Sequence, residues 1–173
     1  MNDGSSSPAF PPEVLPVRCA TPGDIPSLRE LFDRSRLEGK VRGNDTGADL
    51  EHLLEGYFNC DGSGFWVADH DGAVIGMIGV QRLSDNSAEM RRLRVREAYR
   101  RRGVGTRLMQ HAIAFCREMQ YLKVVLDVRI ERSPAISMFD NFGFLHSRER
   151  VIDGRKLLDF YLDLYSDNAD TSV

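Results

Sequence analysis

The sequence predicts one α/β domain built on a mixed β-sheet, and three patterns indicate this fold class. Apolar residues recur at helical spacing in some segments and alternate as in strands in others. Residues 87–128 combine a strand, a glycine-containing turn, a helix and a second strand, which indicates a βαβ crossover. Turn sequences at 69–72 and 153–154 indicate two hairpins. The expected element order is β-α-α-β-β-β-α-β-α-β-β.

Bulk properties exclude several classes of protein. The chain has 173 residues, of which 42% are hydrophobic and 28% charged, as is typical of a single soluble domain. Its net charge of −3 argues against a nucleic-acid partner. Three scattered cysteines and the lack of a signal-peptide pattern predict a cytoplasmic protein without disulfides. No apolar run approaches the ~18 residues of a membrane span, and no metal-ligand spacing occurs.

The N-terminal part is expected to comprise a tail, a short strand and a helix. Residues 1–13 are rich in Ser and Pro and are predicted to be a disordered tail ahead of the domain, residues 14–165. A strand over 14–19 leads to a helix that Thr21 caps, with Asp24 reaching back to the cap as in a capping box. The apolar residues at helical spacing that should form the buried face of this helix are Ile25, Leu28, Leu31 and Phe32.

A second helix and a hairpin are predicted next. The helix covers residues 48–58, and the apolar side chains expected on its inner face are Leu50, Leu53, Leu54 and Tyr57. His52 falls on its polar side. The hairpin strands cover 65–68 and 73–80, and the single tryptophan, Trp66, is assigned to the core rather than to a ligand.

The strand predicted over residues 87–95 carries an unusual number of arginines. Strict alternation gives it one face with Glu89, Arg91, Leu93 and Val95 and another with Met90, Arg92, Arg94 and Arg96. Two interpretations stay open at this point. The strand is either solvent-facing, with the arginine stems packed flat, or it lines an anionic cofactor.

The turn that follows has the properties of a phosphate-binding site. Residues 100–108 are Arg-Arg-Arg-Gly-Val-Gly-Thr-Arg-Leu. Gly103 and Gly105 lack a Cβ, so backbone N–H groups can approach an anion, and the next helix adds its N-terminal amides and dipole. No Lys follows either glycine, which excludes a Walker P-loop, and Leu108 replaces the third glycine of a Rossmann fingerprint. We expect the turn to bind a pyrophosphate.

The remaining elements complete the sheet. They are a helix from Val104 to about Gln120, a buried strand over 123–128, a helix from Ser133 ended by Gly143, a closing hairpin over 144–164 and a polar tail over 166–173. His111 lies on the polar side of the first of these helices, and Cys116 lies on its apolar side. We therefore expect His111 to be exposed rather than a general base, and Cys116 to be a core residue rather than a nucleophile.

Several motifs together resemble the GNAT superfamily of N-acetyltransferases. R-x-x-G-x-G from Arg100 to Gly105 is similar to its acetyl-CoA signature, V-R-x-A-T-P-x-D over 17–24 to its N-terminal entry, and residues 135–144 to its A-I-x-L-Y-x-x-x-G-F segment. V-V-L-D over 124–127 and L-x-F-Y-x-x-L over 158–164 also resemble a eukaryotic subgroup of membrane-associated N-acetyltransferases, whose hydrophobic anchor this sequence lacks. The expected fold is thus the GNAT fold over almost the whole chain.

The resemblance implies an acetyl-CoA-dependent acyltransferase acting on an amine of a small molecule or a protein. The backbone of Leu93 and Val95 would pair with the pantetheine arm, and the strands that carry Val95 and Val128 would splay apart to admit the thioester. The residues expected at the cofactor are Leu93, Arg94, Val95, Arg100, Arg101, Arg102, Gly103, Val104, Gly105, Thr106 and Arg132.

A carboxylate base is useful in this chemistry because only a neutral amine attacks a thioester. Glu89 stands where several GNAT enzymes carry a catalytic Glu, and alternation places it on the face of Leu93 and Val95. Asp127 on the next strand is the second candidate. The alternative for Glu89 is an ion pair with Arg91 or Arg82.

Two positions depart from the family pattern. Phe139 aligns with the Tyr that assists the departing CoA thiolate, and Arg132 replaces an Asn that often contacts CoA. Tyr161 and Tyr165 are the other candidates for that Tyr's role, although neither aligns with its position in the family pattern. These departures keep a non-catalytic CoA-binding regulatory module as the second hypothesis. A nucleic-acid-binding module is the third, and the oligomeric state, a homodimer included, stays open.

Overall fold

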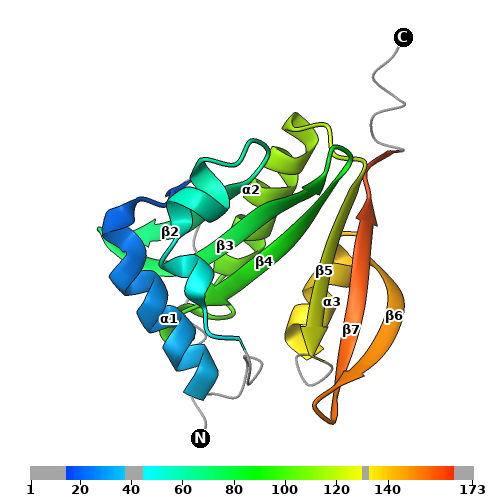
Figure 1. Ribbon diagram of the computed structural model, residues 1–173. Coiled ribbons are helices and arrows are strands. Elements are labelled where there is room, and N and C mark those ends of the chain that lie inside the picture. The colour runs from blue at the N-terminus through cyan, green and yellow to red at the C-terminus, as the bar shows by residue number, and fades with distance from the viewer. Residues whose placement is uncertain (1–14, 38–44, 130–132, 166–173) are drawn as a thin grey trace, which may run out of the picture.

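The structure is a computed structural model that describes residues 15–37, 45–129 and 133–165. Within these residues a seven-stranded sheet has the order β1-β2-β3-β4-β5-β7-β6 (Figure 1). Its strands are β1 (Val17–Cys19), β2 (Gly64–His70), β3 (Ala73–Ser84), β4 (Ser87–Val95), β5 (Lys123–Arg129), β6 (Leu145–Ile152) and β7 (Arg155–Asp163). Only β4 and β5 pair in parallel, through the expected βαβ crossover, so the predicted mixed α/β fold is confirmed.

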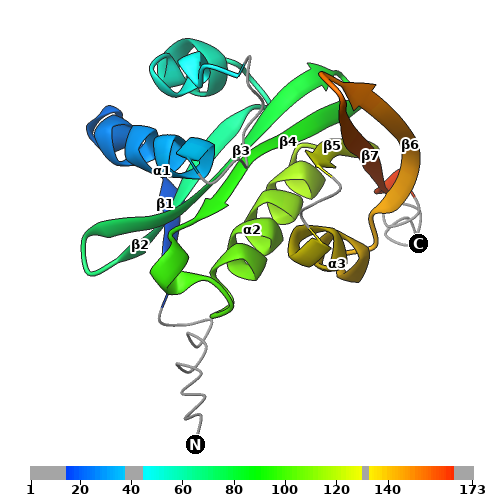
Figure 2. The same cartoon turned by 90° about the horizontal axis from the view of Figure 1, so that it is seen from below.

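Helices cover both faces of the sheet (Figure 2). One face is covered by α1 (Ile25–Leu37) with the short turns η1 (Pro22–Asp24), η2 (Ala48–Leu50) and η3 (Leu54–Phe58). The other face is covered by α2 (Val104–Glu118) and α3 (Ser133–Asn141), and η4 (Glu97–Tyr99) precedes α2. Each face therefore has its own hydrophobic core, one around Phe32 and Tyr57 and one around Trp66 and Leu108.

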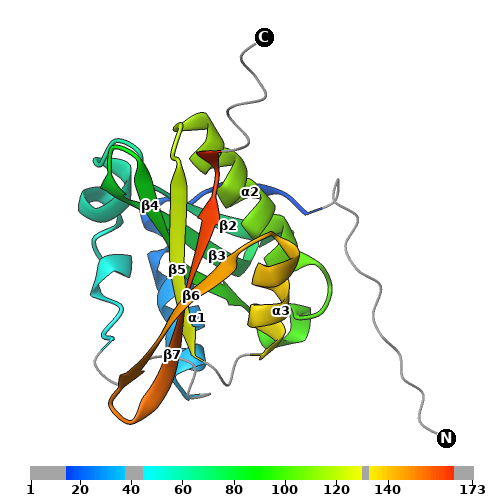
Figure 3. The same cartoon turned by 90° about the vertical axis from the view of Figure 1, so that its right-hand side faces the viewer.

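The C-terminal hairpin places β7 next to β5 and leaves β6 at the edge (Figure 3). Alternate residues of β7 face the α2 side: Phe160 and Leu162 are buried in that core, as is Leu164 just beyond the strand, and Leu158 packs against it partly buried. The other face of β7 carries Asp159 and Tyr161, which therefore lie on the α1 side of the sheet.

The start of α1 follows the sequence prediction. The Thr21 amide donates a hydrogen bond to Asp24 Oδ2 at 2.8 Å, which is the contact from the Asp24 side chain back to the cap that the predicted capping box requires, and the Thr21 hydroxyl donates to the same oxygen at 3.0 Å. Leu28, Leu31 and Phe32 are buried. Residues 1–14 and 166–173 lie outside the described residues, so the predicted tails do too.

The single helix predicted over residues 48–58 is wrong. The chain forms the 3₁₀ turn η2, a break, and the π-helical turn η3. Leu50, Leu53 and Tyr57 are buried as expected, whereas Leu54 is 47% exposed. Asp49 explains part of this irregularity, because its carboxylate is held by side chains of β4 and η3. Gly56 has the lowest helix propensity after Pro and gives the segment little tendency to straighten.

Strict alternation along β4 is also wrong, because β4 contains a β-bulge. Gly79 pairs with Arg91 but Met77 pairs with Arg94, so β4 uses one more residue than β3 over this stretch. Arg92 adopts a φ of +62°, in the left-handed region. Ala88 and Met90 face α2 before the bulge, and Leu93 and Val95 face α2 after it. Glu89 therefore points to the face opposite Leu93 and Val95.

The parallel pairing of β4 with β5 is short. It covers three positions and ends at Glu89 and Val125, although β4 continues to Val95 and β5 to Arg129. The two strands diverge beyond this point (Figure 1). The expected splaying of the strands that carry Val95 and Val128 is thus confirmed.

Candidate functional site

The turn before α2 has the backbone geometry of an anion site. Arg101 has a φ of +61° and Gly103, the N-cap of α2, a φ of +84°. Arg107 donates its amide to the Gly103 carbonyl at 2.9 Å, so the amides of Val104, Gly105 and Thr106 precede the first hydrogen bond of the helix. A Cβ on Gly103 would meet no atom within 4 Å. Helix N-terminal amides that lack an intrahelical partner fit a diphosphate.

Arginine side chains surround this turn. Arg100 Nε donates to the Val95 carbonyl at 3.1 Å, which fixes the turn to the end of β4. The Arg102 guanidinium lies 5.6 Å from the centre of the Tyr99 ring, a cation–π distance. Arg101 is exposed. The turn thus combines positive charge with helix N-terminal amides, which fits the predicted role of residues 100–106.

The end of β4 leads from this turn toward the point where the strands diverge. Leu93 and Val95 pack on the α2 core, and Val95 pairs with Gly76. Their carbonyls accept hydrogen bonds from Arg94 Nη1 at 2.7 Å and from Arg100 Nε. A carbonyl oxygen has two lone pairs, so these contacts do not block a second donor. A Cβ on Gly105 would lie 3.8 Å from Val95, which shows how closely α2 approaches this strand.

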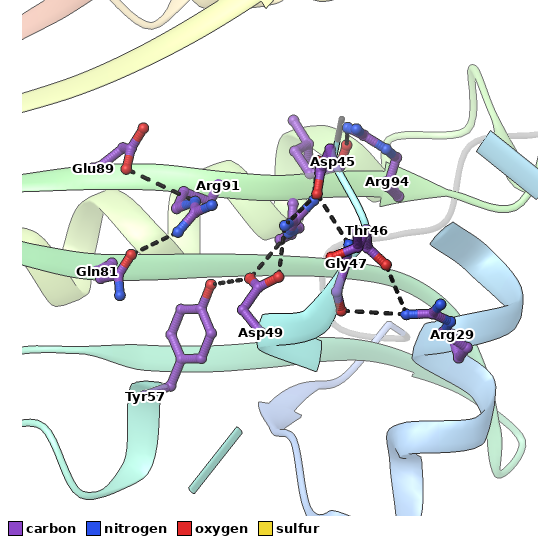
Figure 4. Close-up of polar contacts among 12 residues, drawn as sticks. Arg29, Asp45, Thr46, Gly47, Asp49, Tyr57, Gln81, Glu89, Arg91 and Arg94 are labelled. Carbon is purple, nitrogen blue, oxygen red and sulfur yellow. Dashed lines mark hydrogen bonds and ion pairs between the residues drawn. The ribbon is translucent and has the colours of Figure 1, made fainter. Parts of the chain in front are cut away.

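Glu89 lies on the other face of the sheet, at the last paired position of β4 and β5. Its Oε2 lies 3.8 Å from Arg91 Nε, and its side chain is 30% exposed. Arg91 Nη1 donates a 2.7 Å hydrogen bond to Gln81 Oε1 on β3 (Figure 4). The ion pair that the sequence left as the alternative for Glu89 therefore exists, but its length leaves the carboxylate without a hydrogen bond from Arg91.

Asp127 shares this face but is held by a charge network. It pairs with Asp159 of β7 in the sheet, and Arg150 Nη2 lies 3.4 Å from its Oδ2. Arg150 also binds Asp159 through both Nε and Nη2. Burial acts to raise the pKa of Asp159, but hydrogen bonds from Arg150 and Arg148 outweigh it and hold that pKa below its usual value. Asp127 thus accepts a hydrogen bond from Arg150, whereas Glu89 accepts none from Arg91. This difference makes Glu89 the better candidate base.

Phe139 is buried, and its ring lies among those of Phe144 and Phe160, at centroid distances of 6.0 and 6.1 Å. It has no proton to donate. The suggested substitutes lie elsewhere: Tyr161 is on the Glu89 face, with Lys123 Nζ 5.1 Å from its ring centre, and Tyr165 is 65% exposed. Arg132 lies outside the described residues.

Of the residues that the sequence analysis set aside, Trp66 and Cys116 are buried as expected, whereas His111 is partly buried and not exposed as predicted. Trp66 is buried and contacts His111 and Phe115 edge to face. Burial and the charge of Arg107 lower the pKa of His111, which lies partly buried against this ring. Burial raises the pKa of Cys116 to about 12, so its thiol is unreactive.

One polar cluster was missed by the sequence analysis. Arg92 is 9% exposed and binds Asp45 and Asp49, and Asp49 accepts a further hydrogen bond from Tyr57 (Figure 4). A buried arginine requires acidic partners, so the charge of residue 92 was a signal that acids from elsewhere lie against β4. Its partners are more than 40 residues away in the chain, and no local pattern identifies them.

Comparison with known proteins identifies the family. The acetyltransferase (GNAT) family model matches residues 25–144. The chain belongs to this family. The GNAT structural neighbours include an acetyltransferase from Staphylococcus aureus Mu50, with a TM-score of 0.77 and 21% identity over 87% of this chain and 99% of that one. Another, from Salmonella typhimurium, contains its cofactor acetyl-CoA and has a TM-score of 0.72 and 20% identity over 87% of this chain and 94% of that one.

The relatives in sequence include vertebrate proteins. N-acetyltransferase 8 of Rattus norvegicus is 27% identical over 61% of this chain and 50% of its own length. N-acetylaspartate synthetase of Xenopus tropicalis is 28% identical over 76% of this chain and 49% of its own length. The chain thus spans about half the length of these relatives, and it resembles the eukaryotic subgroup that the motifs suggested. Within the described residues no helix is long and apolar enough to span a membrane.

Proposed function

We propose that this GNAT chain transfers the acetyl group of acetyl-CoA to a primary amine, by direct attack in a ternary complex. One observation carries the proposal: the pairing of β4 with β5 ends at Glu89, so a carboxylate stands where the strands part. The phosphate turn lies on the α2 side and Glu89 on the α1 side. A thioester between the diverging strands would therefore meet an amine that arrives from the Glu89 face.

The chemistry explains why a carboxylate belongs there. Deprotonating a lysine-like amine with a pKa of about 10.4 costs about 4.6 kcal/mol of free energy at pH 7. In the proposed reaction Glu89 accepts the amine proton as nitrogen bonds to the acetyl carbonyl carbon, the C–S bond breaks and the sulfur leaves with the electron pair. The CoA thiol has a pKa near 8.5, so its thiolate can leave without a proton donor at the position of Phe139.

Arg91 bears on the class of acceptor. It stands two residues from Glu89, on the same face, where it donates a hydrogen bond to Gln81 and forms the 3.8 Å ion pair with Glu89. A guanidinium has five donors, so Arg91 can also bind a carboxylate. An amine that carries a neighbouring carboxylate would thus place its nitrogen at Glu89 and its anion at Arg91. Aspartate has this chemistry, and one group of relatives is named for N-acetylaspartate.

A turnover assay tests the proposal. The purified protein is incubated with acetyl-CoA and separately with L-aspartate, L-lysine, spermidine or a short peptide, and release of CoA thiol is measured. We expect turnover with at least one amine, and L-aspartate above spermidine. Acetyl-CoA binding by calorimetry without turnover would favour the regulatory module. Affinity for DNA or RNA that falls steeply with salt, without acetyl-CoA binding, would favour the third hypothesis.

Two further properties are proposals from the sequence. The free cysteines Cys19, Cys60 and Cys116 support a reducing compartment such as the cytoplasm. The second property is assembly as a homodimer, which sedimentation of the purified protein at several concentrations tests.

A further inference from the structure

The Arg92 side chain joins the β4 bulge to the segment 45–50 on the α1 face of the sheet. Nε and Nη2 donate to the two oxygens of Asp49 at 3.0 and 2.6 Å, and Nη1 and Nη2 to those of Asp45 at 2.5 and 3.0 Å. The guanidinium also lies 5.2 Å from the centre of the Phe32 ring on α1. One side chain therefore binds two carboxylates in forked geometry and packs on a helix.

Segment 45–50 makes further contacts besides those with Arg92. Asp45 accepts the Gly47 amide at 3.1 Å, and Arg29 Nη1 donates to the Thr46 carbonyl at 2.9 Å. Gly47 has a φ of +68°, and a Cβ there would come within 2.8 Å of the Phe32 ring. The segment is thus pressed against α1 on one side and fixed to β4 by Arg92 on the other.

Arg92 supplies most of the positive charge that compensates the two carboxylates of the cluster. Burial acts to raise the pKa values of Asp45 and Asp49, but hydrogen bonds and charge from Arg92 outweigh it and hold both pKa values below their usual range. Arg91 contributes further positive charge to the same two carboxylates. Without Arg92, two partly buried carboxylates would face each other with less compensation and would separate toward water.

Segment 45–50 also lies beside the proposed acceptor site. A Cβ on Gly79, the sheet partner of Arg91, would come within 3.0 Å of the Tyr57 ring, and Tyr57 donates a hydrogen bond to Asp49, so the segment and η3 lie close to Arg91. Figure 4 shows Tyr57 bonded to Asp49 on one side of Gln81 and Arg91, and Glu89 farther along β4 beyond Arg91. The bulge thus has two consecutive arginines on this face, one directed at the acceptor site and one at the segment that borders it.

We propose that Arg92 is a positioning residue that fixes segment 45–50 as one wall of the acceptor site, through its paired contacts with Asp45 and Asp49. The inference rests on the proposed acetyltransferase function for its kinetic consequence, but not for the structural one. The proposal gives a role to the side chain of Arg92, the bulge residue whose backbone is left-handed. Loss of the side chain then affects the acceptor more than the cofactor.

The test compares Arg92→Met and Arg92→Lys with a matched control, Arg18→Met. Arg18 likewise binds two aspartates, Asp24 at 2.8 Å and Asp69 at 2.9 Å, but it lies on β1, which β2 and β3 separate from β4. Three quantities are measured for each protein: hydrogen exchange of the amides of residues 46–50, the Kd for acetyl-CoA by calorimetry, and the KM for the most active amine of the turnover panel.

For Arg92→Met we expect at least tenfold faster exchange at 46–50, at least a tenfold higher acceptor KM, and an acetyl-CoA Kd within threefold of the parent. For Arg92→Lys the exchange rate at 46–50 and the acceptor KM should lie between those of the parent and of Arg92→Met, because an ammonium keeps the charge but not the forked hydrogen bonds. Arg18→Met should change none of the three. Unchanged exchange at 46–50 in both Arg92 variants, or equal losses of acetyl-CoA and acceptor affinity, would overturn the proposal. If no amine of the panel turns over, the acetyltransferase function fails, and exchange alone decides whether Arg92 holds the segment.

Discussion

Replacement of Glu89 by Gln removes the proposed base while keeping its size. The carboxylate is 30% exposed and lies 3.8 Å from Arg91, so an amide fits the same space and no buried charge is left without a partner. A positioned general base contributes about 10²–10⁴ in rate. The partial exposure of Glu89 favours the lower end, and we expect kcat/KM at pH 7 to fall about 100-fold.

The pH dependence of this variant gives the stronger test. Without a base only the neutral fraction of the amine reacts, about 1 in 2,500 at pH 7 for a pKa near 10.4, and this fraction rises about tenfold per pH unit. The logarithm of kcat/KM for Glu89→Gln should therefore rise with a slope near one, and the gap to the parent should narrow toward pH 10. The acetyl-CoA Kd, measured by calorimetry, should stay within threefold.

Asp127→Asn is the control for this experiment. Arg150 keeps its contacts with Asp159 when Asp127 is neutralised, so the local structure should persist. We expect kcat/KM within threefold of the parent at every pH. If Glu89→Gln is as active as the parent from pH 6 to 10, or if Asp127→Asn shows the deficit instead, the assignment of the base is wrong.

Other consequences concern the phosphate turn, stability and thiol reactivity. Gly103→Glu puts a carboxylate at the anion site and should abolish acetyl-CoA binding in calorimetry. Gly154→Glu, at a φ of +72° and with equally open space, should not, and binding by both variants would contradict the site. The hydrogen bond from Arg18 lowers the pKa of Asp24 to about 2, so its stabilisation is present above about pH 3.8 and is lost as pH falls toward 2. Because Arg18 is 39% exposed, Asp24→Asn should cost about 1–2 kcal/mol in urea unfolding at pH 7 and almost nothing near pH 2, and an equal cost at both would refute the ion pair. Iodoacetamide at pH 8 should label Cys19 but not Cys116 in the native protein, as mass spectrometry would show; rapid native labelling of Cys116 would contradict its burial.

Periodic patterns predicted much of this fold because each reports a local property. The buried face of α1 was visible in the spacing of Leu28, Leu31 and Phe32, and β4 has the bounds that were predicted for it, residues 87–95. The phosphate turn was also local, since Gly103 and the helix start are adjacent in sequence.

Features set by distant contacts could not be predicted in this way. Alternation along β4 gave the wrong face for Glu89 because the extra residue at Arg92 leaves no mark on polarity: arginines stand on both sides of it. The irregular turns over 48–58 depend on Asp49 binding Arg92, a residue 43 positions later. The neutralisation of Asp127 by Arg150 likewise requires β7 to lie between β5 and β6, an order that sequence alone does not dictate.

A crystal structure with acetyl-CoA bound tests the central claim most directly. We expect the pyrophosphate oxygens within hydrogen-bond distance, about 2.7–3.2 Å, of the amides between Gly103 and Thr106. The thioester carbonyl should lie between β4 and β5, open to the Glu89 face. A pyrophosphate bound away from this turn, or a thioester enclosed on the α2 side out of reach of Glu89, would contradict the account.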